Sequence, residues 1–189
     1  MSGERLGVFG GTFDPIHVGH LTAAGAARYQ LGLDRVLLVV AGDPWQKHDA
    51  VVASAEDRFA MVAAACAGIE GLEASRLELD RPGPTYTIDT LEALAAPDRE
   101  LFLVLGADAA AGLDSWVRAD AVRATATLAV VAREGDRAAP VGAVTVTMPR
   151  LDVSSTDLRR RIANGEPVDF LVPAPALTVI RARGLYTHT

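Results

Sequence analysis

Short apolar runs alternate with helical segments along the chain, and this alternation limits the fold more than any other feature. Runs rich in leucine and β-branched residues occur at residues 6–9, 35–41, 100–105, 127–132 and 143–148. In the run at 35–41, β-branched residues dominate without alternation, which is typical of a sheet covered on both faces. We therefore predict an α/β fold, with a doubly wound parallel sheet and helices on both faces.

The expected helices have recognisable beginnings and ends. Apolar residues at helical spacing, or capping residues, predict helices at residues 18–28, 54–62, 87–94, 154–163 and 173–183. Gly32 is expected to end the first of them. Ser54 is expected to cap the second, and Ser154 or Ser155 the fourth.

A Rossmann-like sheet of this kind binds ligands beyond the carboxyl ends of its strands. We expect the loops at residues 10–17, 42–53 and 106–116 to converge there. The sequence contains no repeat or linker, and a chain of 189 residues can bury roughly 70% of its unfolded surface in one core. We predict a single domain over residues 1–189.

Composition excludes several classes of partner. With 18 basic and 24 acidic residues the net charge is -6, so no broad positive field exists for nucleic acid, and none is expected as a partner. The longest apolar runs are far shorter than the roughly 20 residues that span a bilayer, so no membrane partner is expected. The lone Cys66 cannot form an internal disulfide, which fits the cytoplasm.

Residues 10–20, GGTFDPIHVGH, join the first strand to the first helix and resemble a phosphate site in outline. Gly10 and Gly11 let the backbone approach a ligand, and Thr12 adds a hydroxyl. The following helix begins with N–H groups and a positive dipole end. His17 and His20 are three residues apart, so both can reach the same phosphate chain, and Gly19 is expected to leave room for it.

Other interpretations of this segment are weaker. Its glycines lack the spacing of the dinucleotide fingerprint. Two histidines could bind zinc, but zinc normally takes three or four protein ligands. The remaining candidates are His48, His188 and a cysteine in an apolar helix, so no metal site is predicted.

A second segment, VSSTDLR at residues 153–159, predicts another helix that begins with hydroxyl residues. Arg159 lies one turn inside this helix, where its guanidinium can meet phosphate oxygens as a fork of donors. Taken alone, the segment would be an ordinary capped helix with solvated arginines.

The two segments together resemble a known family. Residues 10–20 resemble the histidine signature of the nucleotidyltransferase superfamily, and in full they are similar to its bacterial nicotinate mononucleotide adenylyltransferase branch. Residues 153–159 resemble the superfamily's ISSTxIR motif. Residues 84–87 (PTYT), 106–108 (GAD) and Trp116 resemble further elements of that branch, in the same order.

The resemblance implies a reaction of ATP with nicotinate mononucleotide that yields deamido-NAD and pyrophosphate, with Mg²⁺ accompanying ATP. It implies catalytic roles for His17, His20 and Arg159. It implies ATP and phosphate contacts from Gly10, Gly11, Thr12, Phe13, Ser155, Thr156, Lys47 and Arg133. For the mononucleotide, it implies that Trp116 stacks on the pyridine ring, Thr87 helps hold the carboxylate and Asp108 binds a ribose.

The chain departs from the branch at two places. PWQK at residues 44–47 replaces PPHK, and REG at 133–135 replaces RPG, so Lys47 and Arg133 can also be solvated cations. Alternative functions are an adenylyl or cytidylyl transferase acting on another phosphate, such as phosphopantetheine, and a non-catalytic nucleotide-binding regulatory module. A fragment of a class I aminoacyl-tRNA synthetase fits poorly with the short acidic chain. The sequence leaves a homo-oligomer open.

Overall fold

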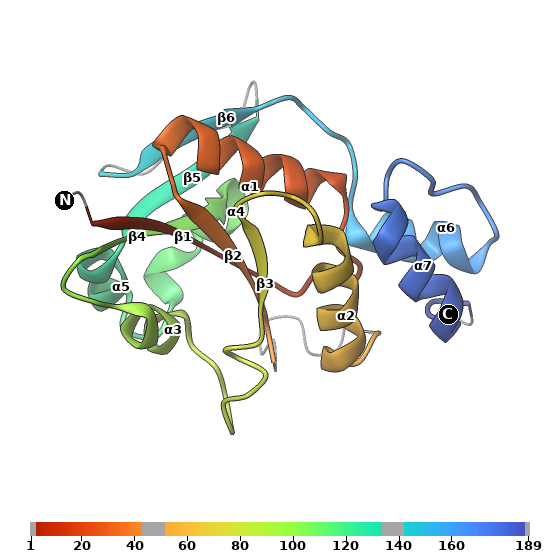
Figure 1. The fold of residues 1–189 in the computed structure, drawn as a ribbon, viewed down its shortest axis with the longest axis horizontal. Helices are drawn as coiled ribbons and strands as arrows, with labels where there is room; N and C mark the ends of the chain where they lie inside the picture. The colour runs from red at the N-terminus through yellow and green to blue at the C-terminus, as the bar shows by residue number, and fades with distance from the viewer. Residues whose placement is uncertain (1–2, 43–51, 134–141, 188–189) are drawn as a thin grey trace.

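One parallel sheet organises the protein (Figure 1). The structure is a computed structural model that describes residues 3–42, 52–133 and 142–187. Within these ranges six strands pair in the order β3-β2-β1-β4-β5-β6, all parallel. They are β1 (Glu4–Gly11), β2 (Arg35–Val40), β3 (Leu72–Ser75), β4 (Arg99–Gly106), β5 (Thr127–Arg133) and β6 (Val144–Met148). The strand order reverses between β1 and β4, as in a doubly wound sheet, which confirms the predicted fold class.

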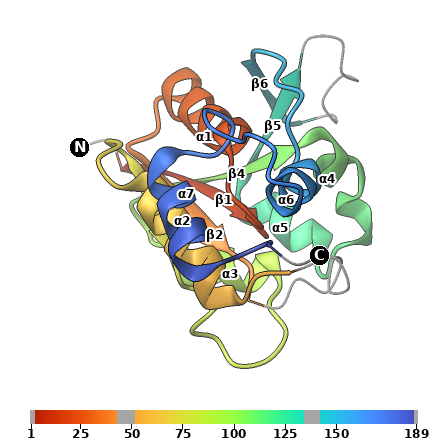
Figure 2. The ribbon, with the colours of Figure 1, turned by 90° about the vertical axis from the view of Figure 1, so that its right-hand side faces the viewer.

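Helices contribute to two hydrophobic cores, one on each face of the sheet. The α1-side core takes buried residues from α1 (Val18–Leu31), α2 (Ala55–Cys66), α6 (Ser155–Ala163) and α7 (Ala174–Arg183). The α3-side core takes them from α3 (Thr87–Leu94), α4 (Ala107–Ala111), the 3₁₀ helix η2 (Leu113–Ser115) and α5 (Ala119–Thr125). The C-terminal α7 lies beside α2 in both views (Figures 1 and 2).

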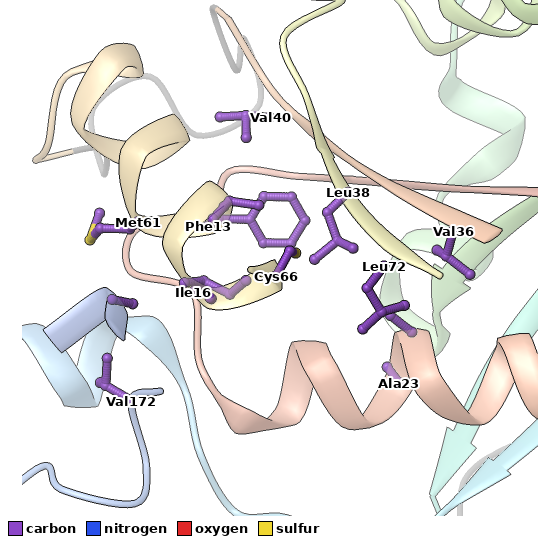
Figure 3. Packing of buried hydrophobic residues seen from close by; sticks show 14 of the residues in the cluster. Phe13, Ile16, Ala23, Val36, Leu38, Val40, Met61, Cys66, Leu72 and Val172 are labelled. Carbon is purple, nitrogen blue, oxygen red and sulfur yellow. The ribbon is translucent and has the colours of Figure 1, made fainter. Parts of the chain in front are cut away.

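The two cores explain why the strands are apolar without interruption. Along β2, Val36, Leu38 and Val40 belong to the α1-side core, whereas Leu37 and Val39 belong to the α3-side core. Successive side chains of a strand point to opposite faces, so both faces need apolar residues. Each fully buried aliphatic side chain contributes about 1.5–3 kcal/mol. Figure 3 shows part of the α1-side core.

Four short elements depart from the sequence prediction. β3 was not predicted, because only its first residue, Leu72, is buried and it forms the end of the sheet. Residues 106–116, predicted as a loop, contain α4 and η2, and α5 follows them. With five and three residues, α4 and η2 are too short to show helical periodicity.

Three further predictions concern the cysteine, membrane-spanning helices and the number of domains. Cys66 is buried and free, and burial raises the pKa of its thiol to about 11. No helix within residues 3–42, 52–133 and 142–187 has the length and apolarity needed to cross a bilayer. The single domain over residues 1–189 stays a prediction.

Candidate active site

Two adjoining pockets lie at the carboxyl edge of the sheet, where β1 and β4 diverge. The histidine pocket, about 720 Å³, is lined by both histidines of the signature and by Arg159. The tryptophan pocket, about 390 Å³, is lined by Thr87 and Trp116. The two share a wall made by Phe9, Gly10, Gly11, Thr12, Gly106, Asp108 and Ala109. Ligands in the two pockets would therefore meet across the glycines at the ends of β1 and β4.

The glycines of the signature serve different purposes. A Cβ on Gly10 would meet no atom within 4 Å, so its missing side chain leaves open space at the shared wall. A Cβ on Gly11 would lie 2.7 Å from the Phe13 ring. A Cβ on Gly19 would lie 3.0 Å from Nδ1 of His17 and 3.1 Å from Val153. Gly19 thus makes room for the His17 ring, and because it also lines the histidine pocket, the room it leaves for a phosphate chain stays a prediction.

Phe13 shapes the loop through its side chain. Its backbone is left-handed, with φ 52, and its ring is buried in the α1-side core near Leu38 and Cys66 (Figure 3). The ring also contacts His20 edge-on, with centroids 5.0 Å apart. Phe13 borders the histidine pocket, but its ring is a core anchor that holds the loop against β2 and α2.

The two histidines form one unit at the start of α1. His17 is the N-cap residue, and its backbone N–H donates to Nδ1 of His20 at 3.2 Å. The rings are stacked with centroids 3.7 Å apart. A neutral imidazole has one donor and one acceptor nitrogen, so an accepting Nδ1 leaves the hydrogen on Nε2 of His20. Backbone and ring contacts therefore set both the orientation and the tautomer of His20.

Hydrogen bonds join the second motif to the first. Ser154 caps α6 by accepting from the N–H of Asp157 at 3.2 Å. Ser155 Oγ donates to the Pro15 carbonyl at 2.9 Å, and Arg159 Nη1 donates to the Asp14 carbonyl at 2.8 Å. Ser155 therefore already uses its hydroxyl hydrogen to join the motifs, while its side chain lines the pocket.

The residues predicted for the mononucleotide come together in the tryptophan pocket. Thr87 is the first residue of α3, and Asp108 lies exposed in the first turn of α4. Trp116 follows η2 and packs partly buried against the α3-side core. Among the described residues that line this pocket there is no lysine or arginine. The polar groups that the described residues offer there are hydroxyls, backbone groups and carboxyls.

Glu78 is a pocket residue that sequence reasoning missed. It lines the tryptophan pocket and accepts a hydrogen bond from Thr90 Oγ1 at 2.9 Å. Burial raises the pKa of this carboxyl, and the hydrogen bonds from Thr90 and Thr85 oppose that shift. No sequence signal singles out Glu78, because it lies in an irregular segment between β3 and α3.

Arg58 is a second missed residue, and it holds the loops around the pockets. Its side chain is fully buried in α2 and donates to the carbonyls of Thr12 at 2.9 Å and Ala41 at 2.7 Å. Burial lowers the pKa of its guanidinium, and nearby Asp14 opposes the shift. A signal for it existed, because Arg58 lies three and four residues before Met61 and Val62 on the buried stripe of α2.

Two predicted cations have no described side chain. Lys47 lies outside the described residues. Arg133 is the last residue of β5 and pairs with Met148 in the ladder. Their phosphate contacts stay predictions.

A family model and several curated relatives match the chain. The family described as "Cytidylyltransferase-like" matches residues 8–161. A Saccharopolyspora erythraea protein named "Probable nicotinate-nucleotide adenylyltransferase" is 46% identical over 97% of this chain and 90% of its own length. A Thermus thermophilus protein of the same name is 45% identical over 96% of this chain and 99% of its own. The chain belongs to the nicotinate-nucleotide adenylyltransferase family.

Membership of the nicotinate-nucleotide adenylyltransferase family confirms the resemblance inferred from residues 10–20 and 153–159. A solved structure supports the fold of this family member. It is the Plasmodium falciparum nicotinic acid mononucleotide adenylyltransferase complexed with NaAD, with a TM-score of 0.79 over 98% of both chains. The sequence identity to it is 15%, so this likeness concerns the fold alone.

Proposed function

We propose that this protein transfers the adenylyl group of ATP to nicotinate mononucleotide, giving deamido-NAD and pyrophosphate. The observation that carries the proposal is the pair of joined pockets. One pocket holds two histidines and an arginine suited to a polyphosphate, and the other holds an aromatic plane suited to a pyridine ring. The family of the chain supports the same reaction.

The reaction needs positioning more than covalent participation by the protein. A phosphate oxygen of the mononucleotide attacks the α-phosphorus of ATP in line. A new P–O bond forms, the bond from the α-phosphorus to the bridging oxygen breaks, and pyrophosphate leaves with that electron pair. Such transfers depend on alignment and on stabilising charge over the phosphoryl oxygens. The shared wall at Gly10 allows both phosphate groups to approach the backbone closely.

Each group in the histidine pocket suits a different part of ATP. Nε2–H of His20 would donate to the α-phosphoryl and bridging oxygens, where charge grows in the transition state. His17 and Thr12 would contact the phosphate chain of ATP near the same oxygens. Arg159 uses Nη1 for the Asp14 carbonyl, and its other N–H groups would meet the β- and γ-phosphates together with Thr156 and the first N–H groups of α6.

Mg²⁺ belongs to this proposal as part of the MgATP substrate. In the ranges that the structure describes, no group of three or more His, Cys, Asp or Glu side chains is arranged to hold a metal ion. The accompanying ion would lower the charge of the phosphates, and no step above passes through it. A cytoplasmic location is part of the same proposal and is supported by the buried, free thiol of Cys66.

The tryptophan pocket suggests how the acid would be preferred over the amide. Trp116 would stack on the pyridine ring. The carboxylate would accept from the Thr87 hydroxyl and from the N–H groups of Thr87 and Ile88, the first two residues of α3. Changing the acid to an amide would leave these donors poorly paired, so we expect nicotinate mononucleotide to be preferred.

The test is pyrophosphate release from ATP with three acceptors in parallel: nicotinate mononucleotide, nicotinamide mononucleotide and phosphopantetheine. We expect the highest kcat/KM with nicotinate mononucleotide. Equal kcat/KM for the acid and the amide would contradict the preference. A higher value with phosphopantetheine would favour the other transferase, and no release with any acceptor would favour a regulatory module.

A further inference from the structure

Asp14 lines the histidine pocket, and its carboxylate lies at the centre of a buried network. The residue is 2% exposed. The carboxylate accepts from the N–H of Val52 at 2.8 Å, the N–H of Ala53 at 3.1 Å and the hydroxyl of Tyr186 at 2.7 Å. Burying a carboxylate costs free energy unless hydrogen-bond donors surround it, and Asp14 has three such donors. The position of Asp14 therefore depends on all of these partners together.

Asp14 is also the residue that holds Arg159. Nη1 of Arg159 donates to the Asp14 carbonyl at 2.8 Å and lies 3.7 Å from its carboxylate oxygen Oδ2. The Arg159 side chain is only 14% exposed, and this contact, together with the longer bond from Nη2 to Thr156 Oγ1 at 3.4 Å, orients its remaining N–H groups. A shift of Asp14 would move the guanidinium that lines the histidine pocket.

Tyr186 comes from the far end of the chain, 172 residues after Asp14. It follows α7, which ends at Arg183 and is capped by Gly184, and it is 4% exposed. Its backbone has a φ of 66, which is unfavourable for a residue other than glycine and persists only where surrounding contacts impose it. Burial, with a further contribution from Asp14, raises the pKa of the Tyr186 phenol, which keeps it protonated as a donor.

Packing on α2 fixes the segment that carries Tyr186. Leu177 and Ile180 of α7 are buried in the α1-side core, and Arg183 Nη1 donates to Asp57 Oδ1 at 2.6 Å. Tyr186 lies outside both sets of pocket-lining residues. Its hydroxyl contacts Met61 Sδ at 3.8 Å in the α1-side core and Asp14 at 2.7 Å, and of these two partners only Asp14 lines the histidine pocket.

We propose that Tyr186 is a positioning residue for the histidine pocket. Through its hydrogen bond to Asp14, it holds Arg159 and the loop of residues 12–17 in the arrangement that ATP requires. This inference rests on the proposed function for the identity of ATP as the ligand. It assigns the C-terminal segment a task in binding polyphosphate in addition to its contribution to the core.

The first experiment compares Tyr186→Phe with Tyr29→Phe. Tyr186→Phe removes the hydroxyl and keeps the buried ring. Tyr29→Phe removes the hydroxyl of a tyrosine on α1 that is 89% exposed. We expect the Kd for ATP, measured by calorimetry without the second substrate, to rise about 3- to 10-fold in Tyr186→Phe. This is less than the loss of a whole bond to a charged group would cause, because Asp14 keeps two N–H donors. The Kd for nicotinate mononucleotide should change less than about twofold, and Tyr29→Phe should match the parent protein.

The second experiment asks whether the effect passes through Arg159. In an Arg159→Lys background, adding Tyr186→Phe should weaken ATP binding by less than about twofold, since residues of one network are not additive. A lower Tm with unchanged ATP binding in folded Tyr186→Phe would show a purely structural role and overturn the inference. Full additivity with Arg159→Lys would overturn the route through Arg159. Because ATP binding is measured directly, failure of adenylyl transfer to the mononucleotide would reject the proposed function separately.

Discussion

Two substitutions of His20 distinguish the roles of its two ring nitrogens. An asparagine side chain places a polar atom two bonds beyond Cβ, where Nδ1 of histidine lies, and a glutamine places one three bonds beyond, where Nε2 lies. His20→Asn can therefore still accept from the His17 N–H but loses the distal donor. His20→Gln keeps a distal donor and loses the cap. Both variants lose the ring contacts with His17 and Phe13, so those losses cancel in the comparison.

The interaction that each substitution removes determines the expected size of its effect. Removing one preorganised donor to a developing oxyanion costs about 10²- to 10³-fold in kcat, roughly 2.7–4 kcal/mol. We expect this loss in His20→Asn, with the KM for both substrates changed much less. Removing a helix N-terminal hydrogen bond costs about 1 kcal/mol. In a chain of this length that lowers Tm by about 2–4 °C, which we expect for His20→Gln relative to His20→Asn.

The assay is steady-state kinetics at saturating ATP and nicotinate mononucleotide, paired with thermal unfolding of the same preparations. A near-parent kcat in folded His20→Asn would refute the role of Nε2. A kcat in His20→Gln as low as in His20→Asn, with equal Tm, would refute the assignment of separate tasks to the two nitrogens.

Three further predictions concern the walls of the pockets. Gly10→Ala should leave Tm unchanged and raise the KM of both substrates, because its Cβ would enter open space at the shared wall. Gly11→Ala should lower Tm, because its Cβ would clash with the Phe13 ring. Equal Tm values for the two variants would contradict this prediction. Trp116→Ala should raise the KM for nicotinate mononucleotide several-fold, since stacking contributes about 0.5–1.5 kcal/mol, and an effect on ATP alone would reject the stacking. The raised pKa of Glu78 contributes stability below about pH 4.5, and this contribution is lost as pH rises through the folded-state pKa. The Tm of Glu78→Gln minus the Tm of the parent protein should therefore become more positive above pH 4.5. A constant difference in Tm between pH 4 and 8 would contradict this prediction.

The sheet was predictable because burial on both faces leaves a strong local signal. β2, β4 and β5 are apolar along most of their length, and each contributes buried residues to both cores. β3 has one buried residue, so its pairing with β2 depends on the sheet and not on its own composition. The short α4 likewise depends on its place after β4.

The pocket residues were predictable only where a contiguous motif carries them. Residues 10–20 and 153–159 are local patterns, and the structure brings them together through Ser155 and Arg159. The contact between Asp14 and Tyr186 joins the two ends of the chain and leaves no local pattern. The network that supports the site therefore had to be found in the structure.

The most direct test of the central claim follows the phosphorus atoms of ATP. The protein would be incubated with nicotinate mononucleotide and with ATP labelled at the α-phosphorus, then with ATP labelled at the γ-phosphorus. We predict that the α label appears in deamido-NAD and the γ label in pyrophosphate, in both cases only when the mononucleotide is present. Label from the γ-phosphorus in the mononucleotide, or release of label without an acceptor, would contradict adenylyl transfer at these joined pockets.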